Sequence, residues 1–167
     1  VDNFASTGRV TVSENASLKV SSGDLTLGNS LRSPGYMTIA DNAKVEVNGD
    51  MVVGKNCGGF LDVGGDSSLK VDGSFYMGRN GGEAVMRIMD NASVSGNEFF
   101  VSGSGENISI QSKFLLEGGR FETRNFLVSG TNSVVSFSGG VSSIEKIALG
   151  SASAQSSAST NMLFVSG

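Results

Sequence analysis

A short apolar segment that ends in glycine recurs along most of the chain, and this recurrence constrains the fold more than any other feature of the sequence. The segment appears as LTLG (25–28), MVVG (51–54), FYMG (75–78), FFVSG (99–103), FLVSG (126–130) and IALG (147–150). The first five closing glycines are separated by 26, 24, 25 and 27 residues, and a gap of 20 follows. Self-similarity at a period of about 20–50 residues is typical of stacked repeat architectures.

Each repeat has two further strand-like segments upstream of that glycine, and apolar residues alternate in both. The pairs in the first segment are Val10/Val12, Met37/Ile39, Leu61/Val63 and Met86/Ile88, and those in the second are Leu18/Val20, Val45/Val47 and Leu69/Val71. Alternation with a period of two predicts a strand with one buried face. No segment sustains a helical period. We expect one vertical inward column made of Val12, Ile39, Val63 and Ile88.

Turn-forming residues recur between these strands. The first strand is followed by Asn15, Asn42, Asp66 and Asn91, each with a small residue next to it. Asn and Asp tolerate left-handed turns, and a small next residue fits an inward-pointing corner. The second strand is followed by Gly23, Gly49, Gly73 and Gly96, which favour a second tight bend.

Three short strands and three corners per repeat predict an all-β fold, a parallel β-helix (β-solenoid) of about six coils with a repeat near 25 residues. Parallel connections favour right-handed winding. We expect one solenoid segment over residues 1–167, part of a longer protein. The regularity weakens after residue 104, and Phe114–Leu115–Leu116 is interpreted as the first strand of the next coil. Residues 151–161 (SASAQSSASTN) are interpreted as a flexible Ser/Ala-rich loop.

The repeats then suggest a family. Residues 53–103, VGKNCGGFLDVGGDSSLKVDGSFYMGRNGGEAVMRIMDNASVSGNEFFVSG, resemble the repeats associated with type V secretion (autotransporter) passengers and PEP-CTERM proteins. The resemblance covers roughly residues 8 to 150. It implies an exported bacterial solenoid, extracellular or on the outer surface, with a structural or adhesive role, and it brings no catalytic residues with it.

Composition excludes several other classes of protein. The 167 residues include no His and one Cys, which removes a His-based catalytic triad, an ordinary zinc site and an internal disulfide. The net charge of −4 with scattered Lys and Arg does not indicate nucleic-acid binding. No apolar run is long enough to cross a membrane as a helix, so we expect no membrane insertion by this segment. We expect the chain not to be an enzyme.

The outward position of the third strand carries unexpectedly bulky apolar residues. The column reads Thr26, Val52, Tyr76, Phe100, Leu127 and Ala148, and we name its four large members, Val52, Tyr76, Phe100 and Leu127, the apolar stripe. Contiguous exposed apolar patches often mark interaction surfaces. We therefore expect the stripe to be covered, either by a loop of this chain or by a partner, including a second copy of the chain.

Charged outward positions suggest an alternative function. Asp62 and Arg87 are neighbours on the outward side of the first strand, and Lys70 lies outward on the second. Asp, Arg and Lys on one face could contact an acidic sugar, as in a glycan-binding or polysaccharide-lyase β-helix. The competing interpretation is a solvated charge ladder, which the alternating signs of Lys19, Glu46 and Lys70 favour.

An acidic row at the first corner is the one candidate cofactor site in the sequence. The row contains Glu14, Asp41 and Asp90, with Gly65 interrupting it. Stacked carboxylates bind calcium when enough oxygens converge. The chain lacks the nonapeptide repeat of recognisable calcium solenoids, and turn chemistry alone explains Asp at a corner. We expect no cofactor, with calcium at this row as the alternative.

Overall fold

The computed structural model describes residues 7–103, 111–130, 133–150 and 162–166. Within these residues the regular structure is β-strand, apart from a 3₁₀ turn (η1, Arg79–Gly81). One sheet has seven strands in the order β1 (Gly8–Val12), β4 (Gly35–Ile39), β7 (Gly59–Val63), β9 (Ala84–Ile88), β11 (Ser112–Leu116), β13 (Val134–Phe137) and β15 (Met162–Val165). The eight-stranded sheet contains β2 (Ser17–Val20), β3 (Leu25–Leu27), β5 (Lys44–Val47), β6 (Met51–Val53), β8 (Ser68–Met77), β10 (Ser93–Gly103), β12 (Arg120–Gly130) and β14 (Val141–Leu149).

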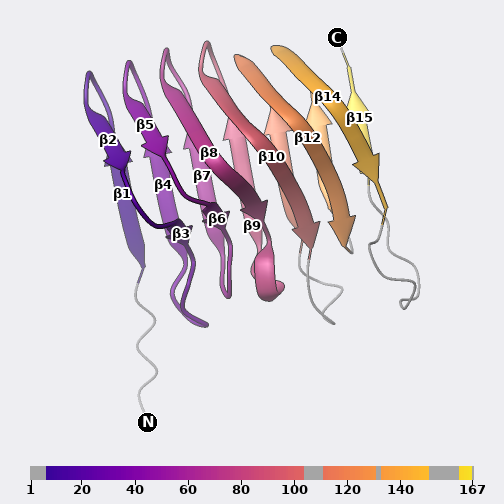
Figure 1. The fold of residues 1–167 in the computed structure, drawn as a ribbon, viewed down its shortest axis with the longest axis horizontal. Helices are drawn as coiled ribbons and strands as arrows, with labels where there is room; N and C mark the ends of the chain where they lie inside the picture. The colour runs from indigo at the N-terminus through magenta and orange to yellow at the C-terminus, as the bar shows by residue number, and fades with distance from the viewer. Residues whose placement is uncertain (1–6, 104–110, 131–132, 151–161, 167) are drawn as a thin grey trace.

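Every strand in the two sheets pairs in parallel with the equivalent strand of a neighbouring coil. In Figure 1 the eight-stranded sheet lies in front with its strands running downward, the seven-stranded sheet lies behind with its strands running upward, and the chain advances to the right. This winding is right-handed, as expected for parallel connections. The chain is thus an all-β parallel β-solenoid with a repeat near 25 residues. Its six first strands, β1, β4, β7, β9, β11 and β13, are each followed by a strand of the eight-stranded sheet.

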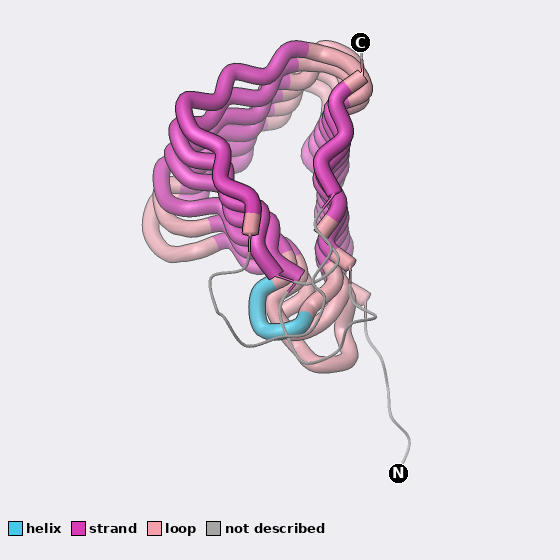
Figure 2. Tube along the Cα trace, turned by 90° about the vertical axis from the view of Figure 1, so that its right-hand side faces the viewer, coloured by secondary structure: helices cyan, strands magenta, loops and turns pink. Residues whose placement is uncertain are grey.

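The predicted three strands per coil are present only in the first two coils. From the third coil onward, the second and third strands form one continuous strand, such as β8. Figure 2 shows the eight-stranded sheet bending while the opposite sheet stays nearly flat. The register between β8 and β10 shifts at Gly96/Glu98. An extra residue on one strand bends it without ending it, so the second corner is a bulge rather than a break.

The expected inward column is confirmed. Val12, Ile39, Val63 and Ile88 are in register with one another and 7, 0, 0 and 0% exposed. Leu116 and Phe137 continue the column. Phe114–Leu116 lies in the strand that pairs with β9, which confirms it as the first strand of the next coil. Residues 104–110 and the expected loop at 151–161 lie outside the described residues.

The first corner is held by residues in the left-handed conformation. Glu14, Asp41 and Asp90 have φ angles of 61, 60 and 56°, and Gly65, at the equivalent position, has 66°. This backbone requirement explains the Asp and Gly residues of the row, but not Glu14. The small residues that follow point inward: Ala43 and Ala92 are 0% exposed and Ser67 is 1% exposed.

The glycine that ends the third strand meets a stricter requirement. Gly28, Gly54 and Gly78 have φ angles of 71, 73 and 75°. A Cβ atom at Gly54 would also overlap the carbonyl oxygen of Glu83 and lie 2.7 Å from its carbonyl carbon. The repeating glycine therefore reports both a left-handed turn and close contact with the next coil.

Gly54→Ala is expected to lower the free energy of unfolding by about 2–3 kcal/mol, because a left-handed alanine costs about 1–2 kcal/mol and overpacking costs more. Gly23→Ala is the matched control, since Gly23 has φ 86° with nothing within 4 Å of an added Cβ. Urea unfolding of both variants would measure the difference. Equal losses would show that the contact with Glu83 is unimportant.

The corners differ in how much their length varies. The connection after the first strand has four residues in the first four coils (13–16, 40–43, 64–67 and 89–92) and three in the next two (117–119 and 138–140). The connection after the third strand has seven, five, six, eight, three and twelve residues (28–34, 54–58, 78–83, 104–111, 131–133 and 150–161). Insertions thus collect at one edge of the solenoid. No helix in the described part of the chain is long and apolar enough to cross a membrane.

Candidate binding face of the eight-stranded sheet

The outer face of the eight-stranded sheet presents columns of side chains that run across successive coils. The first column reads Lys19, Glu46, Lys70, Ser95, Glu122 and Ser143. A second, next to the bend, reads Ser74, Glu98, Asn125 and Lys146. The third is the predicted outward column that contains the apolar stripe. Because the strands of this sheet keep the same register from coil to coil, each column is a nearly continuous row along the solenoid.

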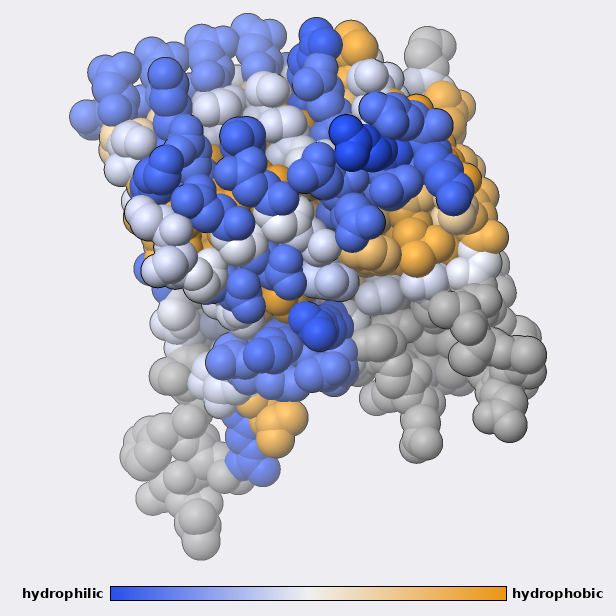
Figure 3. Space-filling view, in the orientation of Figure 1, coloured by the Kyte–Doolittle hydropathy of each residue, from blue (hydrophilic) through white to orange (hydrophobic). Residues whose placement is uncertain are grey.

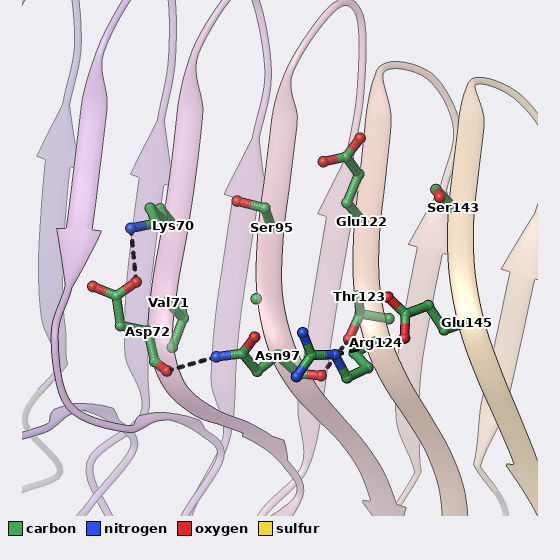
Figure 4. A pocket seen from close by; sticks show the side chains of 11 residues that line it. Lys70, Val71, Asp72, Ser95, Asn97, Glu122, Thr123, Arg124, Ser143 and Glu145 are labelled. Atoms are coloured by element: carbon green, nitrogen blue, oxygen red, sulfur yellow. Dashed lines mark hydrogen bonds and ion pairs between the residues drawn. The ribbon is translucent and has the colours of Figure 1, made fainter.

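A polar groove lies where this face bends. It has a volume of about 360 Å³ and spans β8, β10, β12 and β14. Figure 4 shows Lys70, Asp72, Asn97, Arg124 and Glu145 around it. A smaller hollow of about 290 Å³ continues from it and is lined by Asp72, Asn97, Arg124, Glu98 and Asn125, among others. The bend in the strands thus produces a concave polar surface.

The charged side chains that line the groove are each paired with a side chain of opposite charge. Lys70 Nζ lies 2.7 Å from Asp72 Oδ1, and Arg124 Nε lies 3.5 Å from Glu145 Oε2. The hydrogen bond and charge of Asp72 raise the pKa of Lys70. Glu122 pairs with Arg120. Lys70 therefore pairs within its own strand rather than with Glu46, and the groove presents mixed, mutually compensated charge.

The predicted charge ladder is present at its first step. Lys19 Nζ donates a hydrogen bond to Glu46 Oε2 at 2.9 Å, and the two side chains are 54 and 50% exposed. The hydrogen bond and charge of Lys19 lower the pKa of Glu46. An exposed pair of this kind contributes little to stability and is screened by salt.

This ion pair gives a pH prediction. Since the pKa of Glu46 is lower in the folded state, its contribution to stability is present above the unfolded pKa and is lost as pH falls through the folded pKa. Lys19→Met is expected to raise the pKa of Glu46 toward the ordinary glutamate value, as measured by NMR titration of its carboxyl carbon. Lys44→Met is the control. An unchanged Glu46 titration in Lys19→Met would contradict the pairing.

The apolar stripe lies on the outer face, as its phase predicts. Val52 is nevertheless only 2% exposed, and the other three members are half-buried. The rings of Tyr76 and Phe100 stack with centroids 5.0 Å apart and an angle of 11°. The guanidinium of Arg79, from the 3₁₀ turn, lies 4.8 Å from the Tyr76 ring centroid. A residue of the third corner thus covers the middle of the stripe.

The remaining part of the stripe borders a hollow. Side chains in this column become smaller after Phe100, from Leu127 to Ala148. Together with Glu98, Asn125, Phe126 and Lys146 they line a hollow of about 260 Å³. Figure 3 shows the corresponding apolar patch low on β12 and β14, beneath a band of hydrophilic residues.

The predicted glycan contacts do not form one cluster. Asp62 and Arg87 are in register on the outer side of β7 and β9, but among the described residues no ion pair joins them. Lys70 lies on β8, in the opposite sheet, with its side chain in the polar groove. The outer faces of the two sheets point in opposite directions (Figure 2). Lys70 therefore belongs to a different surface from Asp62 and Arg87.

The acidic corner row uses its carboxylates within the turns. Asp41 Oδ2 accepts a hydrogen bond from Glu14 N at 3.1 Å, and Asp90 Oδ2 accepts one from Gly65 N at 2.9 Å. The carboxylates of Asp41 and Asp90 thus each cap the corner of the preceding coil. Across the residues that the structure describes, no group of three or more His, Cys, Asp or Glu side chains is placed to hold a metal ion.

Sequence reasoning missed the polar column beside the stripe. Glu98, Asn125 and Lys146 each lie two positions before a residue of the outward column, so period-two alternation places them on the same face. Extending the alternation upstream would have found them. The bend residues Asp72, Asn97 and Arg124 carry no such signal, because the bulge interrupts the alternation there.

The fold and this face define the chain as a β-solenoid repeat protein with a grooved outer sheet. Compared with models of protein families, with curated proteins and with solved structures, the chain matches none.

Proposed function

We propose that this chain is a non-catalytic scaffold segment of a bacterial cell-surface or secreted protein, and that the outer face of its eight-stranded sheet is adhesive. The observation that carries the proposal is the continuous stack of core columns, which makes a rod from repeated coils. Such a rod holds a surface at a fixed orientation along its length. The similarity of residues 53–103 to passenger repeats of type V secretion and PEP-CTERM proteins supports an exported location.

Adhesion can be tested with beads to which the purified chain is attached through one of its ends. Beads are expected to bind to bacterial or host-cell surfaces and mucin layers more than beads carrying an unrelated β-solenoid of similar charge. Antibody against the chain should label the surface of intact source bacteria or detect the chain in their culture medium. Signal confined to the cytoplasm, with no bead retention, would overturn the proposal.

A glycan-binding role is the second candidate, and the polar groove favours it over a lyase. The groove presents Asn97, Ser95 and paired charged side chains on a concave surface. These groups offer hydrogen-bond donors and acceptors to the hydroxyl groups of a sugar. A lyase would need Asp62, Arg87 and Lys70 to act together, but Lys70 lies on the opposite sheet from Asp62 and Arg87. Incubation with acidic polysaccharides, monitored by the ultraviolet absorbance of unsaturated products, is expected to show no turnover. Product accumulation would favour the enzyme.

A further inference from the structure

We propose that the hollow beside Phe100, together with the polar groove above it, binds an unbranched neutral oligosaccharide. One sugar ring would stack on Phe100, and the chain would continue toward Asn97 and Arg124. This inference rests on the adhesive part of the proposed function and assigns it a ligand class and a site.

One face of the Phe100 ring is stacked on Tyr76, and the other is directed at the shorter side chain of Leu127. Tyr76 stacks on the side of β8. On the opposite side Phe100 is in register with Leu127, and Ala148 follows. Leu127 and Ala148 are shorter than Phe100, so among the described residues of β12 and β14 no further aromatic ring continues this column. Phe100 therefore forms one wall of the 260 Å³ hollow.

The neighbouring column supplies hydrogen-bonding groups at the same height. Glu98 and Asn125 line the hollow, and Lys146 follows on β14. Glu98 Oε2 accepts a hydrogen bond from Ser74 Oγ at 3.1 Å, which fixes its position. The side chains of Asn125 and Lys146 form no hydrogen bond or ion pair with the rest of the described chain. An apolar wall with a few convergent polar groups is the usual composition of a small-molecule site.

The hollow and the groove form one track. Glu98 and Asn125 line both the apolar hollow and the hollow above it. Asp72, Asn97 and Arg124 connect that second hollow to the polar groove. A ligand longer than one ring can therefore follow the strands from the aromatic wall to the bend.

The charge along the track is balanced, which selects against an ionic ligand: in the hollow Glu98 and Lys146 supply one charge of each sign. In the groove Lys70 is paired with Asp72 and Arg124 with Glu145. An acidic polymer would have to displace these carboxylates, and a basic one would have to displace the cations, so either pays a desolvation and repulsion penalty. A neutral polyol exchanges hydrogen bonds with paired charges without breaking them. The track thus fits a neutral saccharide better than a polyanion or a basic peptide.

Affinity gel electrophoresis of the whole chain would test this with soluble glucomannan, galactan, xyloglucan and dextran as neutral probes, and with polygalacturonate and dextran sulfate as acidic probes. We expect retardation by at least one neutral probe, little changed between about 0.05 and 0.5 M salt. Phe100→Ala removes the aromatic wall, and Ala148→Phe fills the hollow. Each substitution should weaken binding of the retarding probe at least tenfold.

Phe60→Ala is the matched control, because Phe60 is a half-buried outward phenylalanine stacked on Tyr36 at 4.6 Å on the opposite sheet. It should leave retardation unchanged, and circular dichroism should show that all variants are folded. Retardation only by acidic probes, retardation that survives Ala148→Phe, or none at all would overturn the inference. So would sedimentation showing that a second copy fills the hollow. Bead adhesion without retardation would remove the saccharide site while leaving the proposed function intact.

Discussion

Ile39→Asp is expected to unfold the protein at room temperature or to lower its free energy of unfolding by about 5 kcal/mol or more. Ile39 is 0% exposed and lies between Val12 and Val63 in the inward column. Aspartate there loses the burial of an isoleucine and places a carboxylate among apolar side chains with no cation to pair with it. Since a domain of this size is stabilised by about 5–15 kcal/mol, the loss consumes most of its stability.

Thr38→Asp is the control for this change. Thr38 is the preceding residue of β4 and is exposed on the outer face, so its substitution is expected to cost only about 1 kcal/mol, including the repulsion from Asp62 beside it on β7. Thermal unfolding followed by circular dichroism would compare the two. Val52→Asp adds a third point: Val52 points outward but is 2% exposed, so we expect a loss between the other two. A tolerated Ile39→Asp would show that the column is not the core.

Phe114→Ala is expected to lower the free energy of unfolding by about 3–5 kcal/mol. The Phe114 side chain is 0% exposed, and its ring centroid lies 4.7 Å from that of Phe121, 5.3 Å from Phe126 and 5.8 Å from Phe137. These rings come from β11, β12 and β13, so Phe114 joins both sheets and two successive coils. Its removal leaves a cavity that parallel backbone ladders on both sides prevent from collapsing.

Phe164→Ala is the same chemical change at a site where the side chain is 52% exposed, and it should cost less than about 1 kcal/mol. Chemical denaturation of both variants gives the comparison. A loss under about 1 kcal/mol for Phe114→Ala as well would mean that the aromatic cluster repacks and is not a fixed part of the core.

The fold was predictable because the same alternation of apolar residues recurs in each repeat. Val12, Ile39, Val63 and Ile88 follow one period, and in register they form one column. The merging of two strands into β8 was not predictable in the same way. A glycine such as Gly73 is compatible with either a corner or a bulge, and the choice depends on the strand of the next coil.

The candidate site was predictable only where alternation holds. The phase of Tyr76 and Phe100 followed from it, and so would the position of Asn125. The low exposure of Val52 did not follow, because alternation predicts which way a side chain points and not whether other residues cover it. Grouping Lys70 with Asp62 and Arg87 was wrong as a spatial arrangement, since residues of the second strand turn to the opposite sheet at the first corner.

The variable length of the connection after the third strand makes the solenoid a scaffold that can display peptides at regular spacing. The connection after the third strand accommodates between three and twelve residues, while strand pairing on both sides keeps its register. A foreign peptide spliced between Gly54 and Gly58 would therefore be presented without shifting any column of the core. Peptides spliced into successive coils would be spaced by one strand separation, about 4.8 Å, along a single edge.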